Sequence, residues 1–460
     1  IVFKDKAAVE SHLTTLYNQM RDRQEHWYVD LLLISDSHSD NAYAGTTGAE
    51  VVPFENNSIE GSNSVLERDW NRYLEDVARA NKLICDLVTD NSLTTAERAQ
   101  YKAEAKIFRA MVMFDMVRLW GDFPVITTVA DDITSENIDE VYPQYFPKQN
   151  TELEAYQQIE KDLLDAVLYA PDNTPGNKTL FSKSVARTLL AKIYAEKPLR
   201  DYTKVIQYCD EVKADGFDLV DDFSDLFGMN AAGTDAKMRN TKESILEAQF
   251  TSGAGNWCTW MFGRDLVNWN NNFTWAKWVT PSRDLISAFK QEGDEVRFKE
   301  SIVYYDCNWS NYYPSDNYPF MYKCRSANSS IIKYRYADVL LLKAEALIMQ
   351  DTPDLEGAAD IIDKVRDRAK LGALPTSVRS NKNVLLNALL KERRLELAFE
   401  GQRWFDLVRL DKVEEVMNAV YSKDSGRKAQ IYTFDKNSYR LPIPQSVIDA
   451  NDKIHQNPGY

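Results

Sequence analysis

Five tryptophans that could take part in ligand binding lie within a short stretch of the chain: Trp257, Trp260, Trp269, Trp275 and Trp278. The segment is rich in Asn, and four of these amides, Asn268, Asn270, Asn271 and Asn272, surround one tryptophan. An indole ring can stack on the apolar face of a sugar while amides bond its hydroxyls. Since single buried tryptophans are common, the pattern predicts a platform made of at least two of these rings.

A second group of polar side chains has types that bind metals: Asp36, His38, Asp40 and Asn41. A calcium loop requires Asp or Asn at its third position and Gly at its sixth, and this segment has neither. We therefore predict no metal here. The segment is interpreted as a polar loop after the first helix, in which Asn41 could join Tyr43 and Asn57 on the ligand surface.

Signals for catalysis or for a cofactor are scarce. The sequence has no serine nucleophile elbow, no Gly-rich phosphate loop and no H-E-x-x-H or C-x-x-C motif. No catalytic residue and no cofactor are predicted. A glycosidase stays open as an alternative, because its two carboxylates meet in space and not in sequence. The spacing also leaves open whether Cys307 and Cys324 form a disulfide.

Charged residues share the leucine-rich face of a helix predicted over residues 383–400. The face carries Arg393, Glu396 and Glu400, and the chain continues with Arg403, Asp406 and Arg409. Charges on a core face need partners of opposite sign. This arrangement predicts a half-buried salt-bridge network with a structural and not a catalytic role.

Helices must position these groups, since hydrophobic residues recur with a 3.6-residue period through much of the chain. The clearest helix is predicted over residues 95–120, opened by the capping-box spacing of Thr94 and Glu97 and stopped by Gly121. Four degenerate helix pairs of the tetratricopeptide type are predicted in all: 6–33 with 66–88, 95–120 with 152–169, 182–212, and 333–370.

The predicted fold class is all-α, a tetratricopeptide-like scaffold of about four helix pairs with a long loop-rich insertion. We interpret residues 1–460 as one domain, in which 1–214 hold repeats one to three and 331–460 hold the fourth repeat and a C-terminal packing segment. Residues 215–330 form the irregular Trp-rich insertion. This insertion is the candidate ligand site, because loops on a rigid scaffold commonly carry binding residues.

Composition limits the partners that the chain can have. Its 460 residues are 44% hydrophobic and 27% charged, which is typical of a folded globular protein. The net charge of -15 makes nucleic acid an improbable partner, because phosphate binding draws on clustered Lys and Arg. No stretch approaches the roughly 18 to 20 apolar residues of a membrane span.

Segments spread over the chain then form a recognisable order: 3–10, 109–124, 334–346, 392–409, 441–445 and 456–460. The most specific is 392–409, which reads E-R-R-L-E-L-A-F-E-G-Q-R-W-F-D-L-V-R. In this order the segments resemble the SusD or RagB family of starch-utilisation lipoproteins. The resemblance covers nearly the whole chain except the Trp-rich insertion.

This resemblance implies an α-helical fold of four repeat pairs without enzymatic activity. It implies a glycan ligand bound before residues 281–289, at Trp257 to Trp278, and delivery of that oligosaccharide or polysaccharide to a TonB-dependent, SusC-like transporter. It also implies a lipid anchor on a cysteine upstream of Ile1, at the outer-membrane surface. Because some members of the family serve peptide uptake, peptide binding stays an alternative.

Overall fold

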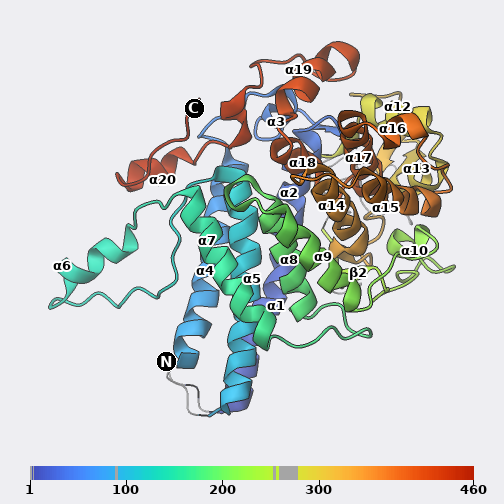
Figure 1. The fold of residues 1–460 in the computed structure, drawn as a ribbon. Coiled ribbons are helices and arrows are strands. Elements are labelled where there is room, and N and C mark those ends of the chain that lie inside the picture. The colour runs from blue at the N-terminus through green and yellow to red at the C-terminus, as the bar shows by residue number, and fades with distance from the viewer. Residues whose placement is uncertain (1–2, 4, 89–91, 252–254, 258–277) are drawn as a thin grey trace.

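The computed structural model describes residues 3, 5–88, 92–251, 255–257 and 278–460. Helices dominate, and the strands of the described part are short and paired in twos (Figure 1). The scaffold helices are α1 (Lys6–Asp22), α4 (Ser64–Val88), α5 (Thr95–Trp120), α7 (Glu152–Tyr169), α8 (Lys183–Ala195), α9 (Tyr202–Ala214), α14 (Tyr336–Met349) and α15 (Leu355–Arg368). The predicted all-α fold class is confirmed.

The scaffold helices pack in pairs: α1 with α4, α5 with α7, α8 with α9, and α14 with α15. Successive pairs also contact one another, through α4 with α5, α7 with α8 and α9 with α14. Figure 1 shows α4, α5 and α7 side by side, followed by α8 and α9 and then by α14 and α15. The four predicted tetratricopeptide-like pairs therefore form one continuous array.

Helix α5 begins and ends where the sequence predicts. Its capping box is complete, because the Thr94 hydroxyl accepts from the Glu97 amide (3.1 Å) and the Glu97 carboxylate accepts from the Thr94 amide (3.0 Å). At the other end Gly121 has φ +75°, a left-handed conformation that glycine adopts without steric cost. A side chain there would also meet the Arg440 guanidinium, 2.4 Å from the Cβ position.

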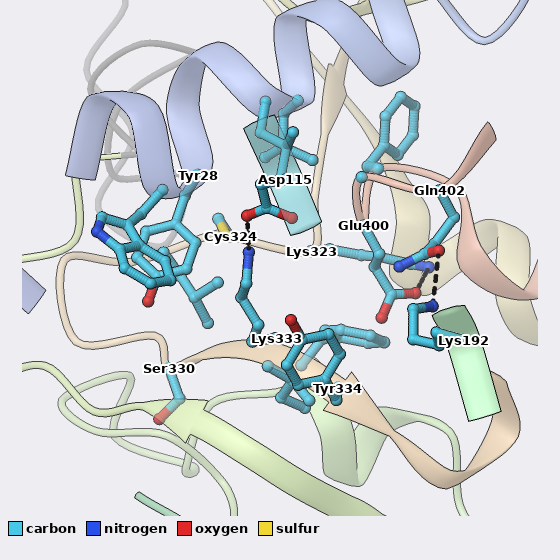
Figure 2. A pocket seen from close by; sticks show the side chains of 18 of the residues that line it. Tyr28, Asp115, Lys192, Lys323, Cys324, Ser330, Lys333, Tyr334, Glu400 and Gln402 are labelled. Atoms are coloured by element: carbon cyan, nitrogen blue, oxygen red, sulfur yellow. Dashed lines mark hydrogen bonds and ion pairs between the residues drawn. The ribbon is translucent and has the colours of Figure 1, made fainter. Parts of the chain in front are cut away.

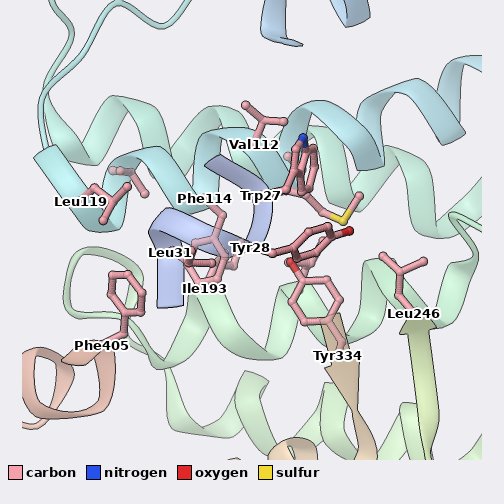
Figure 3. Close-up of a cluster of buried hydrophobic side chains, with 14 of the residues drawn as sticks. Trp27, Tyr28, Leu31, Val112, Phe114, Leu119, Ile193, Leu246, Tyr334 and Phe405 are labelled. Atoms are coloured by element: carbon pink, nitrogen blue, oxygen red, sulfur yellow. The ribbon is translucent and has the colours of Figure 1, made fainter. Parts of the chain in front are cut away.

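The hydrophobic core joins distant parts of the chain. Figure 3 shows Phe114 of α5 beside Ile193 of α8, and Trp27, Tyr334 and Phe405 belong to the same cluster. All five side chains are buried. Because they come from five separate segments of the sequence, the N-terminal and C-terminal parts of the chain stabilise each other through a shared apolar core.

The predicted salt-bridge network is present, and it is more deeply buried than expected. Helices α17 (Lys382–Leu397) and α18 (Arg403–Arg409) carry it. The Glu396 carboxylate pairs with Arg335 (2.5 Å), Arg368 (2.8 Å) and Arg297 (3.2 Å). Burial alone raises the pKa of Glu396, but the three guanidinium charges outweigh it and lower the pKa to about 2. Each buried charge is thus compensated, which the apolar surroundings require.

Residues 215–330 contain more regular structure than their lack of periodicity indicates. Strand β2 (Ser244–Ala248) pairs with β6 (Ile331–Arg335), β4 (Ile302–Tyr305) with β5 (Tyr318–Met321), and β3 (Thr280–Pro281) with β1 (Ala42–Tyr43). Helices α12 (Arg283–Glu292) and α13 (Glu295–Ser301) lie between them. The prediction of an irregular segment is wrong for these parts. Such short strands and helices span too few residues to show a hydrophobic period in the sequence. Cys307 lies in a small aromatic cluster and Cys324 in the main core.

Candidate functional site

Of the two predicted platform tryptophans that the structure describes, Trp257 is the exposed one. Trp257 is 48% exposed, and its backbone amide donates to the Gln24 side-chain oxygen (2.7 Å). Gln24 is itself buried and donates back to the Gly255 carbonyl (3.0 Å). The preceding Asn256 is buried and bonds the Ser329 carbonyl (2.9 Å). Trp257 therefore combines an exposed ring with a backbone that is fixed from two sides.

Trp278 lies deeper than Trp257. It is half-buried and packs against the main core, and its carbonyl accepts a hydrogen bond from the Ser37 hydroxyl (2.5 Å). These contacts hold Trp278 itself against the core. The other three predicted platform residues, Trp260, Trp269 and Trp275, lie outside the described residues.

Asn41 and Tyr43 are fully buried, which corrects the prediction that they lie on a ligand surface. The Asn41 amide donates to Asp36 (3.0 Å), and its oxygen accepts from Arg394 Nε (2.8 Å). The Tyr43 hydroxyl donates to Asp424 (2.5 Å). Their polar atoms bond partners up to 381 positions away in sequence. These two side chains therefore stabilise the fold.

An aromatic layer that the sequence interpretation missed lies around Tyr43. Tyr312 stacks on Tyr43 with ring centroids 4.9 Å apart and an interplanar angle of 12°. Its hydroxyl donates to Glu55 (2.6 Å), and the Arg283 guanidinium lies 4.1 Å from the centre of the Tyr313 ring. The adjacent Tyr312 and Tyr313, in a loop rich in Asn, were the sequence signal that could have predicted this layer. This layer fixes the loop that follows β4 against helix α3 (Val52–Asn56).

The polar side chains at residues 36–41 are buried, and Asp40 among them forms ion pairs with two arginines. Asp40 accepts two hydrogen bonds from Arg403 and lies 3.2 Å from Arg394. Burial alone raises the pKa of Asp40, but these two arginines outweigh it and hold the pKa well below its usual range. Burial lowers the pKa of His38 to about 4, so its ring is neutral at pH 7. In the described part of the chain no cluster of three or more His, Cys, Asp or Glu side chains could hold a metal.

Among the predicted polar site residues that the structure describes, Asn57 lines an open groove. It has φ +58°, a conformation that Asn tolerates, and its amide donates to the Tyr432 carbonyl (2.7 Å). The groove has a volume of about 650 Å³. Its lining includes Glu60, Gly61, Tyr432, Thr433, Asp435, Asn437, Ser438, Gln445, Gln456, Gly459 and Tyr460. The sequence interpretation missed all of these partners, since nothing local links residues near 57 to residues near 432.

A second hollow, lined mainly by buried side chains, is too small for a sugar. Figure 2 shows it between Tyr28, the Asp115–Lys333 pair (2.8 Å) and the Lys323–Glu400 pair (2.7 Å). Its volume is about 60 Å³. That space suits a few water molecules, whereas ligand sites commonly measure about 300 to 1,000 Å³. The exposed Trp257 region and the groove at Asn57 are the candidate binding surfaces that contain predicted site residues.

The described helices include none that is both long and apolar enough to cross a bilayer.

Two family models match the chain. Residues 2–195 match the model described as starch-binding and associating with the outer membrane, and residues 317–460 match the SusD family model.

Relatives of known name match over most of their length. SusD-like protein P2 of Formosa agariphila is 27% identical, with 100% of this chain and 93% of the relative covered. Starch-binding protein SusD of Bacteroides thetaiotaomicron is 24% identical, with 80% and 74% covered.

Solved structures share the fold. A laminarin-binding SusD-like protein has a TM-score of 0.76 at 23% identity, with both chains covered completely. Surface glycan-binding protein A from Bacteroides fluxus has a TM-score of 0.78 at 21% identity, with 99% of each chain covered. Matches at both ends of the chain, relatives that span it and a shared fold agree with one another: the chain is a member of the SusD/RagB-like family.

Proposed function

We propose that this protein binds glycans without cleaving them. The observation that carries the proposal is Trp257, a half-exposed residue of the insertion whose backbone amide is bonded to Gln24. An aromatic ring on a backbone that is already held in place stacks on a pyranose ring at a lower entropic cost. The names of the relatives, which include a starch-binding and a laminarin-binding protein, support a polysaccharide or oligosaccharide ligand.

The proposed role at the cell is capture and delivery. The protein acts as a lid on a SusC-like, TonB-dependent transporter barrel, and it raises the local concentration of a weakly bound glycan beside the pore. A lipid anchor holds it at the surface of the outer membrane, which fits the family description of association with that membrane. Gentle detergent extraction followed by affinity purification tests the partner. Recovery of the protein without any barrel protein would remove the delivery role.

The binding function is tested on a glycan array run beside a peptide library, with the wild type and two variants. Trp257→Ala removes the proposed platform. Tyr169→Ala is the matched control, because Tyr169 is an aromatic residue of similar exposure (49%) at the end of α7. Glycan binding that weakens only in Trp257→Ala supports the proposal. Binding restricted to peptides, or release of shortened products from labelled oligosaccharides, contradicts it.

A further inference from the structure

The groove at Asn57 is framed by segments that are far apart in sequence and firmly joined. The Ile431 amide donates to the Asn56 carbonyl (2.8 Å), and the Gln445 amide donates to the Gly61 carbonyl (2.9 Å). Figure 1 shows the corresponding C-terminal segments, in red, lying against the N-terminal loop, in blue. The Gln456 side chain bonds both the amide (2.7 Å) and the carbonyl (2.9 Å) of Ile443. The groove is thus preformed.

Two tyrosines offer aromatic surface in the groove. Tyr432 is 58% exposed, and its hydroxyl has no partner among the described residues. Tyr460 is 43% exposed, and its hydroxyl donates to the Arg440 carbonyl (2.8 Å), which fixes the ring. Exposed aromatic rings in a preformed groove provide stacking surface, and a free hydroxyl on one of them can also bond a ligand.

The charges around the groove select against anionic ligands. Its lining includes the carboxylates Glu60 and Asp435 and contains no Lys or Arg among the described residues. The cations that follow in the chain are engaged elsewhere: Lys436 lies 3.2 Å from Glu414, and Arg440 lies 3.4 Å from Asp122. Carboxylates and amides accept hydrogen bonds from hydroxyl groups, and the two carboxylates repel sulfate and uronate groups.

We propose that this groove is a second saccharide-binding site, separate from Trp257, that takes a short neutral oligosaccharide. The inference rests on the proposed glycan-binding function and adds a place and a ligand class to it. Tyr432 supplies the stacking ring, while Glu60 and Asn437 bond hydroxyls. A volume of about 650 Å³ lies within the range of small-ligand sites and admits more than one sugar ring.

The test uses the whole chain and defined probes. Neutral hexaoses of the malto, laminari, xylo and manno series are titrated by calorimetry beside oligogalacturonate and sulfated galactan oligosaccharides. Tyr432→Ala should weaken binding of a neutral probe about tenfold, the effect of losing one aromatic contact. Tyr142→Ala is the control, because Tyr142 is 53% exposed on the projecting segment that contains α6 (Ile138–Val141).

Hydrogen exchange with and without probe gives a readout that does not depend on a variant. Bound neutral oligosaccharide should slow exchange in residues 57–61 and 432–438. Wild-type binding that Tyr432→Ala leaves unchanged, without protection there, overturns the second site and leaves the glycan-binding function standing. Protection by anionic probes overturns the ligand class. If no probe binds the wild type, the glycan-binding function fails and the second site fails with it.

Discussion

Arg403 and Asp40 form a buried bidentate pair, with Nε to Oδ1 and Nη2 to Oδ2 distances of 2.8 Å each, between residues 363 positions apart in sequence. The pair joins the turn after the π-helix η2 (Leu33–Ser37) to the start of α18. Arg394 lies 3.2 Å from the same carboxylate and 2.8 Å from Asp284. Asp40 thus compensates the buried Arg403 and contributes, with Asp284, to the compensation of the buried Arg394.

Asp40→Asn should therefore destabilise the fold by about 3 to 5 kcal/mol, because it leaves the buried Arg403 without its counter-charge, whereas Arg394 keeps its pair with Asp284. Urea unfolding followed by circular dichroism measures the loss. Lys197→Gln is the control: it breaks an exposed pair with Asp411 (2.9 Å) and should cost under about 1 kcal/mol. Equal losses in the two variants would contradict the anchoring role of Asp40.

Stability should depend on pH through His38. The unfolded chain protonates this ring near pH 6.5 and the folded chain only near pH 4, so the unfolded state binds more protons between these values. The unfolding free energy should fall by about 3 kcal/mol as the pH drops through this window. His38→Gln should remove that slope, while His455→Gln, at an exposed position, should keep it. Parallel profiles for the wild type and His38→Gln would show that another group is responsible.

The two described tryptophans of the predicted platform, Trp257 and Trp278, should differ in their effects on stability and on glycan affinity. Trp278→Ala should cost about 3 kcal/mol of stability, since its ring packs against the core. Trp257→Ala should leave the melting temperature within about 2 °C of the wild type and lower glycan affinity about tenfold. Thermal unfolding and calorimetric titration of the same two proteins provide the measurement. A stable Trp278→Ala together with an unstable Trp257→Ala would reverse the assignment.

Gly121→Ala should destabilise the end of α5 by about 2 kcal/mol. The positive φ strains any residue with a side chain, and the new methyl group would lie against the Arg440 guanidinium. Gly372→Ala is the matched control, because a Cβ there meets no atom within 4 Å. Chemical denaturation of both variants decides the point, and an unchanged midpoint for Gly121→Ala would argue against a strained turn.

The sequence predicted those features that depend on neighbouring residues. The bounds of α5 follow from a capping box and a glycine that act within one turn of the helix. For Arg393, Glu396 and Glu400 the sequence predicted only that each has a partner of opposite charge. A buried charge requires such a partner, but this requirement does not identify the residue that provides it.

Other features could not be predicted, because they depend on contacts between distant residues. The two-residue strand β1 acquires its pairing from β3, more than 200 positions later. Asn41 looked like a surface residue because its polarity is visible in sequence, whereas its bond to Arg394 is not. The groove was missed for the same reason, since Asn57 and Tyr432 meet only in the folded chain.

The end of α5 depends on residues that are synthesised long after it. The Trp120 indole donates to the Pro442 carbonyl (3.0 Å), and the Asn457 amide donates to the Trp120 carbonyl (2.9 Å), across 322 and 337 positions. Such contacts cannot form while the intervening chain is still being translated. A nascent chain therefore carries an uncovered Trp120 surface throughout elongation, and the final closure is a post-translational and comparatively slow folding step. During that interval the exposed indole surface is a natural target for a molecular chaperone.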